Sequence, residues 1–421
     1  MREQAYRDPV HGFITLTDEL LIRLIDTPEF QRLRRIRQLG ATSGTYHGAE
    51  HSRFGHSLGA MWVMHAVLER LQHMGYYIDE EVRVVALCSA LLHDLGHGPF
   101  SHVLERCLVP SVAHEEWSAR LVLDDTHVHR CLADADSLLP VLVAAVLRGE
   151  YDGPRFVVEL VASQLDVDRM DYLIRDALYA GVTYGHFDLH RVIHTLQLVD
   201  EQVVVQAKGV VAVEEYVLAR YLMYWQVYFH KATRSQELLL QGVWRRAVNQ
   251  WQQGYLTADE TAPSLRPFLR GDPITSQAYL ALDDHDYVAS LKAWRGHQDP
   301  ILADLAGRFL ERRLLKPVFK VPYAGEVSPQ FGVVRELVSR RGWDPEYYVM
   351  LDRTSDVAYD TYDADEESAG SPILSLDETG RPREISHLSP AIRAVAVRPR
   401  RAVNLYVPQD VVQEVRTLFR V

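Results

Sequence analysis

Cysteine is scarce in this chain and long apolar runs are absent, and each shortage excludes certain classes of protein. Only Cys88, Cys107 and Cys131 occur among 421 residues, and none are spaced as CxxC. Such usage argues against a disulfide framework and a zinc knuckle, and it fits a reducing cytoplasm. No run of about eighteen apolar residues occurs, and the first residues lack the apolar centre of a signal peptide. We therefore expect a cytoplasmic protein with no membrane as partner.

Positive charge is also in short supply. The 45 Lys and Arg residues face 57 Asp and Glu residues, which gives a net charge of −12. Coating nucleic acid requires a basic field, so single-stranded nucleic acid is a possible partner but not a predicted one. A local basic pocket for an anionic substrate remains compatible with this balance. With 47% apolar residues, the chain can build a sizeable core and two domains or more.

Histidine, by contrast, is concentrated in one part of the chain, because nine of the 19 histidines fall within residues 47–114. His93 and Asp94 stand side by side at the end of the apolar segment 84–92. Imidazole nitrogens and carboxylate oxygens together suit a divalent transition metal. Such an ion generates hydroxide near neutral pH and polarises a phosphoryl oxygen, so the sequence predicts a metal-dependent phosphohydrolase.

Adjacent residues cannot surround an ion, so the remaining ligands must come from other segments. We predict that His56, His93, Asp94 and Asp168 bind one divalent cation, with Mn, Fe, Co, Ni, Mg and Zn all open. Taken singly, a residue such as His56 is more often a helix cap or a surface histidine, and one such as Asp168 is more often one half of a salt bridge. The prediction depends on the joint pattern of all four residues.

The apolar spacing predicts a mainly α fold. We expect a helical domain over residues 1–316, with a small β-hairpin at 196–208, and a smaller α+β region over residues 317–421. The expected helices cover 19–25, 30–39, 57–74, 81–92, 115–123, 138–147, 155–179, 212–251, 331–340 and 409–419. The expected C-terminal strands cover 318–322, 347–351 and 402–407, and the acidic stretch 360–367 is expected to be a solvated loop.

Helical spacing also predicts which polar side chains share a face. Asp168, Tyr172 and Asp176 are four residues apart, whereas Asp171 and Arg175 lie on another face and are expected to form an ordinary ion pair. A second polar stripe comprises Arg220, Tyr224, Tyr228 and Lys231. This stripe is either one wall of a ligand pocket or a boundary face whose side chains reach water.

Several of these segments resemble those of one enzyme family. The motifs are Gly48-Ala49-x-His51-x-Arg53-Phe54-x-His56-Ser57, His93-Asp94-x-Gly96-His97-Gly98-Pro99-Phe100-Ser101-His102, Asp166-x-Asp168-x-x-Asp171-Tyr172, Asp26-Thr27-Pro28-Glu29-Phe30-Gln31-Arg32-Leu33-Arg34 and Tyr228-x-His230-Lys231. Taken in their order along the chain, these five motifs resemble those of the HD-superfamily deoxynucleoside triphosphate triphosphohydrolases. The resemblance runs from about Asp8 to Lys316 and continues more weakly beyond. It implies an HD-domain helical bundle.

The resemblance also implies a role for each matching residue. The metal ligands match the four residues predicted above. The catalytic set matches His97, His102, His114 and the neighbouring Glu115. The phosphate-binding set matches Arg53, Arg169, Arg220 and Lys231. Tyr172 and Asp176 match residues that hold the sugar 3′-hydroxyl, and Gln38, Leu39 and Tyr228 match the wall that excludes a 2′-hydroxyl.

Regulation by a second nucleotide is implied as well. An allosteric activator site at a subunit interface would use Asp26, Gln31, Arg34, Arg312 and Lys316, within a homo-oligomer that is a dimer or a tetramer. Gln4 stands where the family has a phosphate-binding lysine, so this chain departs from the pattern there. The plainer alternative is that the arginines of residues 32–37 form a solvated helix face.

The function that the resemblance implies is hydrolysis of deoxynucleoside triphosphates to a deoxynucleoside and triphosphate. Histidine suits protonation of the leaving 5′-oxygen, and His97 and His102 both remain candidates. Two alternatives stay open: an HD phosphohydrolase acting on another nucleotide or phosphoester, and a nucleotide or single-stranded nucleic-acid sensor with little turnover.

Overall fold

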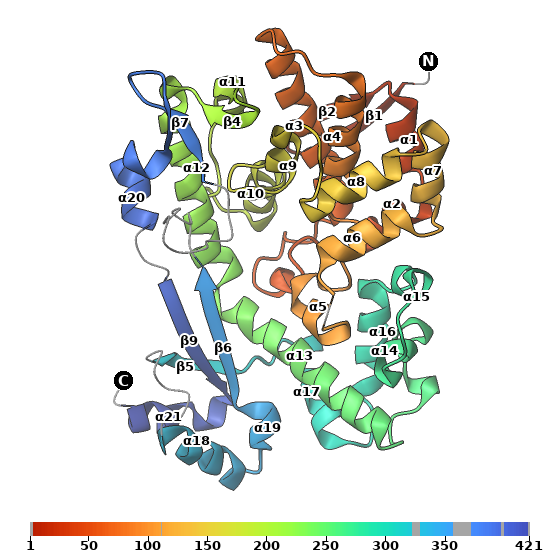
Figure 1. Ribbon diagram of the computed structural model, residues 1–421. Helices are drawn as coiled ribbons and strands as arrows, with labels where there is room; N and C mark the ends of the chain where they lie inside the picture. The colour runs from red at the N-terminus through yellow and green to blue at the C-terminus, as the bar shows by residue number, and fades with distance from the viewer. Residues whose placement is uncertain (1–2, 111, 322–328, 357–371, 397–399, 420–421) are drawn as a thin grey trace.

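The computed structural model describes residues 3–110, 112–321, 329–356, 372–396 and 400–419. Helices dominate, and small sheets lie at the N-terminus and in the C-terminal part, so the mainly α prediction with a smaller α+β region is confirmed (Figure 1). Within the described part of the chain, no helix is both long and apolar enough to cross a bilayer. The acidic stretch 360–367 lies outside the described residues.

The helices and strands have these bounds. The α-helices are α1 (Glu19–Ile25), α2 (Pro28–Arg32), α3 (Arg53–His73), α4 (Glu80–Leu92), α5 (His102–Leu108), α6 (His114–Leu123), α7 (His127–Ala135), α8 (Leu139–Arg148), α9 (Arg155–Val161), α10 (Val167–Ala180), α11 (Leu189–Thr195), α12 (Val210–Met223), α13 (Lys231–Gln252), α14 (Arg266–Arg270), α15 (Ser276–Leu280), α16 (Asp284–Trp294), α17 (Pro300–Leu310), α18 (Pro329–Arg340), α19 (Pro345–Tyr348), α20 (Pro390–Ala396) and α21 (Val412–Phe419). The strands are β1 (Gln4–Asp8), β2 (Gly12–Leu16), β3 (Leu196–Val199), β4 (Gln202–Val205), β5 (Lys316–Val321), β6 (Met350–Asp356), β7 (Leu374–Leu376), β8 (Pro382–Glu384) and β9 (Arg400–Val407).

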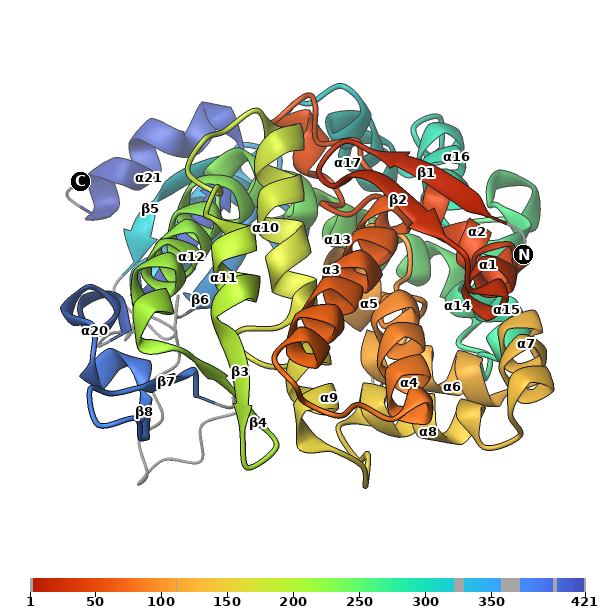
Figure 2. The same ribbon diagram turned by 90° about the horizontal axis from the view of Figure 1, so that it is seen from above.

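The first element is an antiparallel hairpin, β1–β2, which the sequence analysis did not predict. Seen from above, it lies beside α3 (Figure 2), and His11 in its turn stacks on Trp62 of α3 with ring centroids 4.3 Å apart. Asp8 accepts hydrogen bonds from the backbone N–H groups of Val10 and His11, so its side chain shapes the turn.

The predicted helix over residues 30–39 is wrong, because α2 ends at Arg32 and a 3-10 turn follows. The backbone is extended at Ile36, and Arg37 forms an isolated antiparallel bridge with Ser52. A turn follows over residues 38–40, where the Gln38 N–H donates to the His51 carbonyl. The solvated arginine face is also wrong for Arg32, which is buried and donates to the carbonyls of Leu282 and His97. The helix over 19–25 is confirmed with the predicted bounds.

Two long helices predicted from apolar spacing are each interrupted. The span 155–179 divides into α9 and α10, because Asp166 caps α10 by accepting a hydrogen bond from the Arg169 N–H. The span 212–251 divides into α12 and α13, which a π-helical turn over Tyr224–Tyr228 separates. The α13 helix therefore leaves in a new direction (Figure 1).

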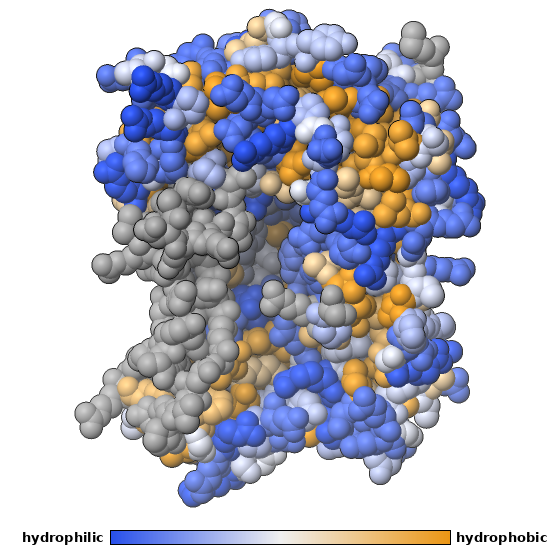
Figure 3. All heavy atoms as spheres, in the orientation of Figure 1, coloured by the Kyte–Doolittle hydropathy of each residue, from blue (hydrophilic) through white to orange (hydrophobic). Residues whose placement is uncertain are grey.

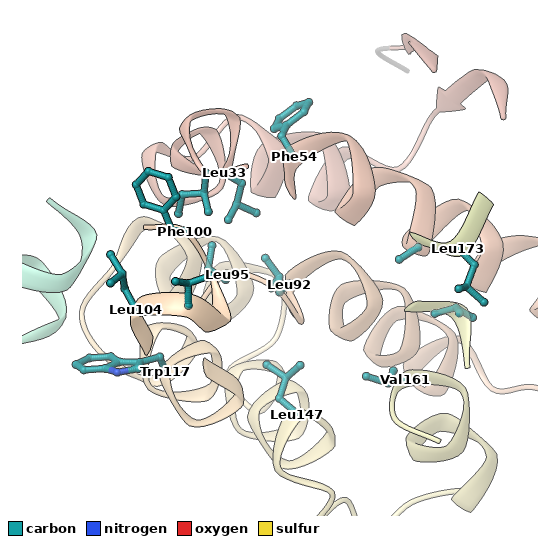
Figure 4. Packing of buried hydrophobic residues seen from close by; sticks show 14 of the residues in the cluster. Leu33, Phe54, Leu92, Leu95, Phe100, Leu104, Trp117, Leu147, Val161 and Leu173 are labelled. Carbon is teal, nitrogen blue, oxygen red and sulfur yellow. The ribbon is translucent and has the colours of Figure 1, made fainter. Parts of the chain in front are cut away.

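The hydrophobic core surrounds the histidine-rich segment. The α3 helix packs against α4 and α10, and Leu92 and Leu95, on either side of His93 and Asp94, are fully buried. Figure 4 shows Leu92, Leu95, Phe100 and Leu104 turned into this apolar cluster. Apolar packing thus fixes the backbone on both sides of the polar pair.

The C-terminal part contains two sheets, with strand orders β5-β9-β6 and β3-β4-β7-β8. Strands were correctly predicted near 318–322 and 402–407, but residues 347 and 348 belong to α19, so β6 begins only at Met350. The predicted hairpin at 196–208 is confirmed as β3 and β4. Because β7 pairs with β4, residues from both sides of position 316 share one sheet. The domain boundary at 316 stays a prediction.

Candidate active site

The side chains of the four predicted metal ligands meet in the structure. His56 Nε2 lies 3.1 Å from His93 Nε2, 3.0 Å from Asp168 Oδ1 and 3.6 Å from Asp94 Oδ2. His93 Nε2 lies 3.4 Å from Asp94 Oδ1. Three separate elements supply them: α3 carries His56, the end of α4 precedes His93 and Asp94, and Asp168 lies in the first turn of α10.

Hydrogen bonds to the opposite ring nitrogens orient both imidazoles. His56 Nδ1 lies 2.8 Å from Asp171 Oδ2, and His93 Nδ1 lies 2.8 Å from the Ala90 carbonyl. Both Nε2 atoms are therefore left to face each other and the two carboxylates. Metal-binding histidines in proteins are usually fixed in this way through their second nitrogen.

Asp171 contributes more than the ordinary ion pair expected from the sequence. It does accept from Arg175 (2.8 Å), but both residues are fully buried, and its other oxygen lies 2.6 Å from His11 Nε2. Arg175 also donates to Asp8 of the β1–β2 hairpin at 2.8 Å. A chain of contacts thus connects the hairpin to His56.

The donor set fits a divalent cation. Burial opposes protonation of His56, but hydrogen bonds with Asp168 and Asp171 and the negative charge of Asp94 outweigh it and raise the pKa of His56 to about 10. Contacts with His56 and His93 likewise outweigh burial and hold the pKa of Asp168 below its usual range. Two imidazole nitrogens and two ionised carboxylates therefore surround a position that favours positive charge.

The three predicted catalytic histidines form a second group beside the first. His97 and His114 stack at 3.9 Å between centroids, and His102 lies 5.0 Å from His114. Glu105, which the sequence analysis missed, accepts from both His102 and His114 at 3.1 Å. Its position one helical turn after His102 is the signal that could have revealed it. Glu115 contacts His114 at 3.3 Å.

His97 and His102 differ strongly in their surroundings. The His97 side chain is 2% exposed and its Nε2 lies 3.2 Å from Asp94, whereas the His102 side chain is 67% exposed. Burial, together with the nearby charge of Arg53 and His114, holds the pKa of His97 well below its usual value. His97 is thus a neutral, enclosed imidazole, and His102 has an accessible edge.

A cavity of about 1110 Å³ opens onto both groups. The predicted residues that line it are Gln38, Leu39, Arg53, His93, Asp94, His97, His102, His114, Glu115, Asp168, Arg169, Tyr172, Asp176, Arg220 and Tyr228. The shared face of α10 is therefore confirmed as a wall of the cavity. In the view of Figure 3 the surface is hollowed near its centre, and hydrophilic side chains border the hollow.

Two arginines on the cavity wall, the buried Arg220 and the half-buried Arg169, retain unused hydrogen-bonding capacity. Arg220 forms no ion pair within the described parts of the chain, and its Nε has no hydrogen-bond partner there. Arg169 is paired with Asp166, yet its Nε also lacks a partner. A buried guanidinium without a carboxylate is costly unless an anion binds to it.

Polar side chains around Asp176 also line the cavity. Asp176 accepts from the Tyr228 hydroxyl (2.7 Å) and lies 2.8 Å from His51 Nε2. Burial and the charge of Asp176 raise the pKa of Tyr228 well above its usual value, so the hydroxyl stays protonated. The Gln38 side-chain oxygen is buried without a hydrogen-bond partner among the described residues.

Comparison with known proteins identifies the family. The HD domain matches residues 53–176, and the HD associated region matches residues 187–420, which is more than half of the chain. The uncharacterized protein YwfO of Bacillus subtilis is 40% identical over 410 residues, covering 97% of this chain and 93% of that protein. This chain belongs to the HD-domain family.

Two further relatives of this HD protein carry descriptive names. A phosphohydrolase from Bacteroides thetaiotaomicron has a solved structure with a TM-score of 0.83 and 31% identity, covering 96% of this chain and all of that one. The deoxynucleoside triphosphate triphosphohydrolase SAMHD1 of Gallus gallus is 28% identical over 368 residues, 78% of this chain but 57% of that protein. The HD protein therefore spans little more than half of that relative.

Not every predicted residue of the HD protein reaches the cavity. Lys231 is exposed and does not line it, because the π-helical turn and the break at His230 end the stripe that begins at Arg220. The expectation that Lys231 shares this wall is wrong, while Arg220, Tyr224 and Tyr228 do line it.

The predicted activator residues fall in two regions of the HD protein. Asp26 ends α1, and Arg34 donates to Gln31 at 2.8 Å. Arg312, at the end of α17, donates to the Gly44 carbonyl, and Lys316 begins β5. Their role in binding an activator stays a prediction.

Proposed function

We propose that this HD phosphohydrolase cleaves deoxynucleoside triphosphates to a deoxynucleoside and triphosphate. The observation that carries the proposal is the cavity itself. A cluster that favours a cation lies on its wall together with Arg220, a buried guanidinium without an ionic partner in the described structure. Such a cavity suits a polyanion that binds a metal ion at one end and arginine along its length.

The sugar would lie against the part of the cavity wall that holds Tyr172, Asp176 and Gln38. Tyr172, Asp176 and the unpartnered Gln38 oxygen offer hydrogen bonds to a 3′-hydroxyl. Leu39 and Tyr228 fill the space beside them, so a 2′-hydroxyl would be rejected by crowding rather than by a missing hydrogen bond. The likeness to SAMHD1 proteins supports this substrate class.

A divalent cation held by His56, His93, Asp94 and Asp168 would supply activation of water and polarisation of a phosphate oxygen. Arg169 and Arg220 would hold the triphosphate in line for attack of water oxygen on the α-phosphorus. The bond from that phosphorus to the 5′-oxygen breaks, and the 5′-oxygen takes a proton.

His102 is the proton donor that the geometry favours. Its Nδ1 faces Glu105, so Nε2 is the nitrogen available to a ligand in the cavity. Although burial opposes it, hydrogen bonds from His102 and His114 keep the pKa of Glu105 below its usual value. An ionised Glu105 stabilises the protonated imidazole that donates to the leaving oxygen. His97 is enclosed and its Nε2 already faces Asp94.

The test is a panel of the four dNTPs and four rNTPs incubated with the metal-loaded protein, with product analysis. We expect triphosphate and deoxynucleoside from dNTPs only, and loss of both products in Asp168→Ala. Release of orthophosphate or pyrophosphate instead would contradict this cleavage and show that the protein hydrolyses a different phosphate bond. Binding of dNTPs with no metal-dependent product would contradict the proposal and favour a nucleotide sensor with little turnover.

A further inference from the structure

The loop that carries His97 is braced from outside the cavity by the segment that leads into α16. Tyr279 donates from its hydroxyl to the Gly96 carbonyl at 2.6 Å. Arg32 donates to both the His97 and Leu282 carbonyls at 2.9 Å. These contacts hold the backbone on the far side of the loop from the proposed substrate.

Asp284, the first residue of α16, makes the decisive contact. Its Oδ1 accepts the Phe100 N–H at 2.8 Å, and its Oδ2 accepts the Arg37 N–H at 3.0 Å. The side chain is 1% exposed. One carboxylate therefore ties the loop between His97 and His102 to the extended segment that continues into Gln38 and Leu39.

The loop needs such support because its backbone is strained. Phe100 and Ser101 have φ values of 54° and 51°, a region that residues other than glycine rarely adopt. Gly40 approaches this strained turn so closely that an added Cβ would lie 2.9 Å from the Phe100 carbonyl oxygen. The two segments are thus pressed together at the point where Asp284 binds both.

Ser101 adds a connection toward the cation site. It accepts from Arg53 Nε at 2.8 Å and donates to the Arg37 carbonyl at 3.2 Å, and Arg53 also donates to Asp94 at 2.5 Å. A shift of the loop would therefore displace three groups together: His102, the segment that contains Gln38, and Arg53, which donates to Asp94.

We propose that Asp284 is a positioning residue that fixes His102 on one cavity wall relative to Gln38 and Leu39 on the other. This inference deepens the proposed function and rests on it for its kinetic part. Asp284 does not line the cavity, so it acts through the groups that it binds, which are the two backbone N–H groups and the Arg37 guanidinium, whose Nη1 lies 3.5 Å from Oδ2. No single neutral side chain of its size accepts from both, because asparagine offers one acceptor oxygen and would aim its amide N–H₂ at the other N–H.

The experiment compares Asp284→Asn and Asp284→Glu with the matched control Asp299→Asn. Asp299 is a largely buried carboxylate (side chain 11% exposed) at a helix start that accepts a backbone N–H (Leu302, 2.7 Å) and, like Asp284, pairs with an arginine (Arg246) and lies outside the cavity lining. Asp284→Glu keeps the charge and both acceptors and displaces them by one methylene, so it tests position even if Asp284→Asn folds poorly.

With the metal-loaded full chain and dNTP, both Asp284 variants should lose about tenfold or more in kcat with KM changed less than about threefold. Amide hydrogen exchange in peptides covering 97–104 and 36–40 should speed up in these variants and stay at the wild-type rate in Asp299→Asn. Wild-type kcat in both Asp284 variants, or unchanged exchange in those peptides, would overturn the proposal. If wild-type protein turns over no dNTP, the proposed function fails, while the exchange measurement still decides whether Asp284 holds the loop.

Discussion

Asp171 is buried between the imidazoles of His11 and His56 and the guanidinium of Arg175. It binds no substrate in the proposed mechanism, yet it decides which nitrogen of His56 faces the other ligands. Carboxylates in this position raise the basicity of a ligand imidazole and fix its ring. The cation affinity of the site should therefore depend on a residue that never touches the cation.

The variant Asp171→Asn should lower metal affinity by 10- to 100-fold, because the amide cannot replace the charge that orients His56. The measurement is a titration of metal-free protein with Mn²⁺ or Co²⁺. Asp8→Asn is the matched control, since Asp8 also binds Arg175 but makes no contact with His56 among the described residues. Equal affinities in wild type and Asp171→Asn would contradict the prediction.

Protons should compete with the cation over a wide pH range. The pKa of His56 in the metal-free protein is raised to about 10, so metal binding at pH 7 must displace a proton. Apparent affinity should rise about tenfold per pH unit below that value for each proton displaced. Calorimetry in buffers of different ionisation enthalpy would count the protons, and release of none would contradict the assignment.

The same shift affects the stability of the metal-free protein. Its folded state binds the His56 proton more tightly than the unfolded chain, whose pKa is near 6.5. That stabilisation is fully present below pH 6.5 and is lost as the pH rises toward 10. Urea unfolding of metal-free protein at pH 6 and pH 9.5 should show lower stability at the higher pH, and metal should remove the difference.

Elements differed in how well the sequence predicted them. Helix α1 and the hairpin β3–β4 were found where expected, because local capping and apolar spacing determine them. The break between α12 and α13 was missed, since the apolar pattern continues across the π-helical turn at Tyr224–Tyr228. Periodicity reports which face is buried, and it does not reveal an extra residue accommodated within a turn.

Long-range contacts explain what was missed at the site. The four proposed ligands could be predicted because each lies in a recognisable motif. Asp284 and His11 could not, because their partners Phe100 and Asp171 are 184 and 160 residues away. Nothing in the local sequence around Asp284 distinguishes it from a residue that merely begins a helix.

The π-helical turn places Tyr228 against Asp176, and this position should control sugar selection. Tyr228→Ala should open the wall and raise the rNTP to dNTP ratio of kcat/KM by about tenfold, whereas Tyr228→Phe should keep the ratio near wild type. The readout is the ratio itself, which a general loss of stability leaves unchanged. If Tyr228→Ala leaves the rNTP to dNTP ratio of kcat/KM unaltered, Tyr228 is not the residue that excludes the 2′-hydroxyl.

At the scale of the whole molecule, the N- and C-terminal parts are joined through the shared β4–β7 pairing and the ion pair of Arg234 with Asp352. The predicted activator residues come from both ends of the helical part of the sequence, and the predicted site lies between subunits. Assembly of the 48.1 kDa chain is therefore the property to measure.

We expect light scattering to report a dimer or tetramer, with a shift toward the larger species when a dNTP is added. Arg34→Ala and Arg312→Ala should weaken that shift while leaving metal content at the wild-type level, because neither residue contacts the cation cluster. A mass near 48.1 kDa with and without nucleotide would remove the basis for activation through a subunit interface.

The hairpin that meets Asp171 also sets an order of events during synthesis. Asp8 and His11 leave the ribosome early, but their respective partners Arg175 and Asp171 are more than 150 residues downstream. At ordinary translation speeds this interval lasts roughly ten to thirty seconds. In the second half of this interval the nascent chain already carries His56, His93 and Asp94 but lacks Asp171, which orients His56, so we expect metal to bind only after Arg175 has emerged.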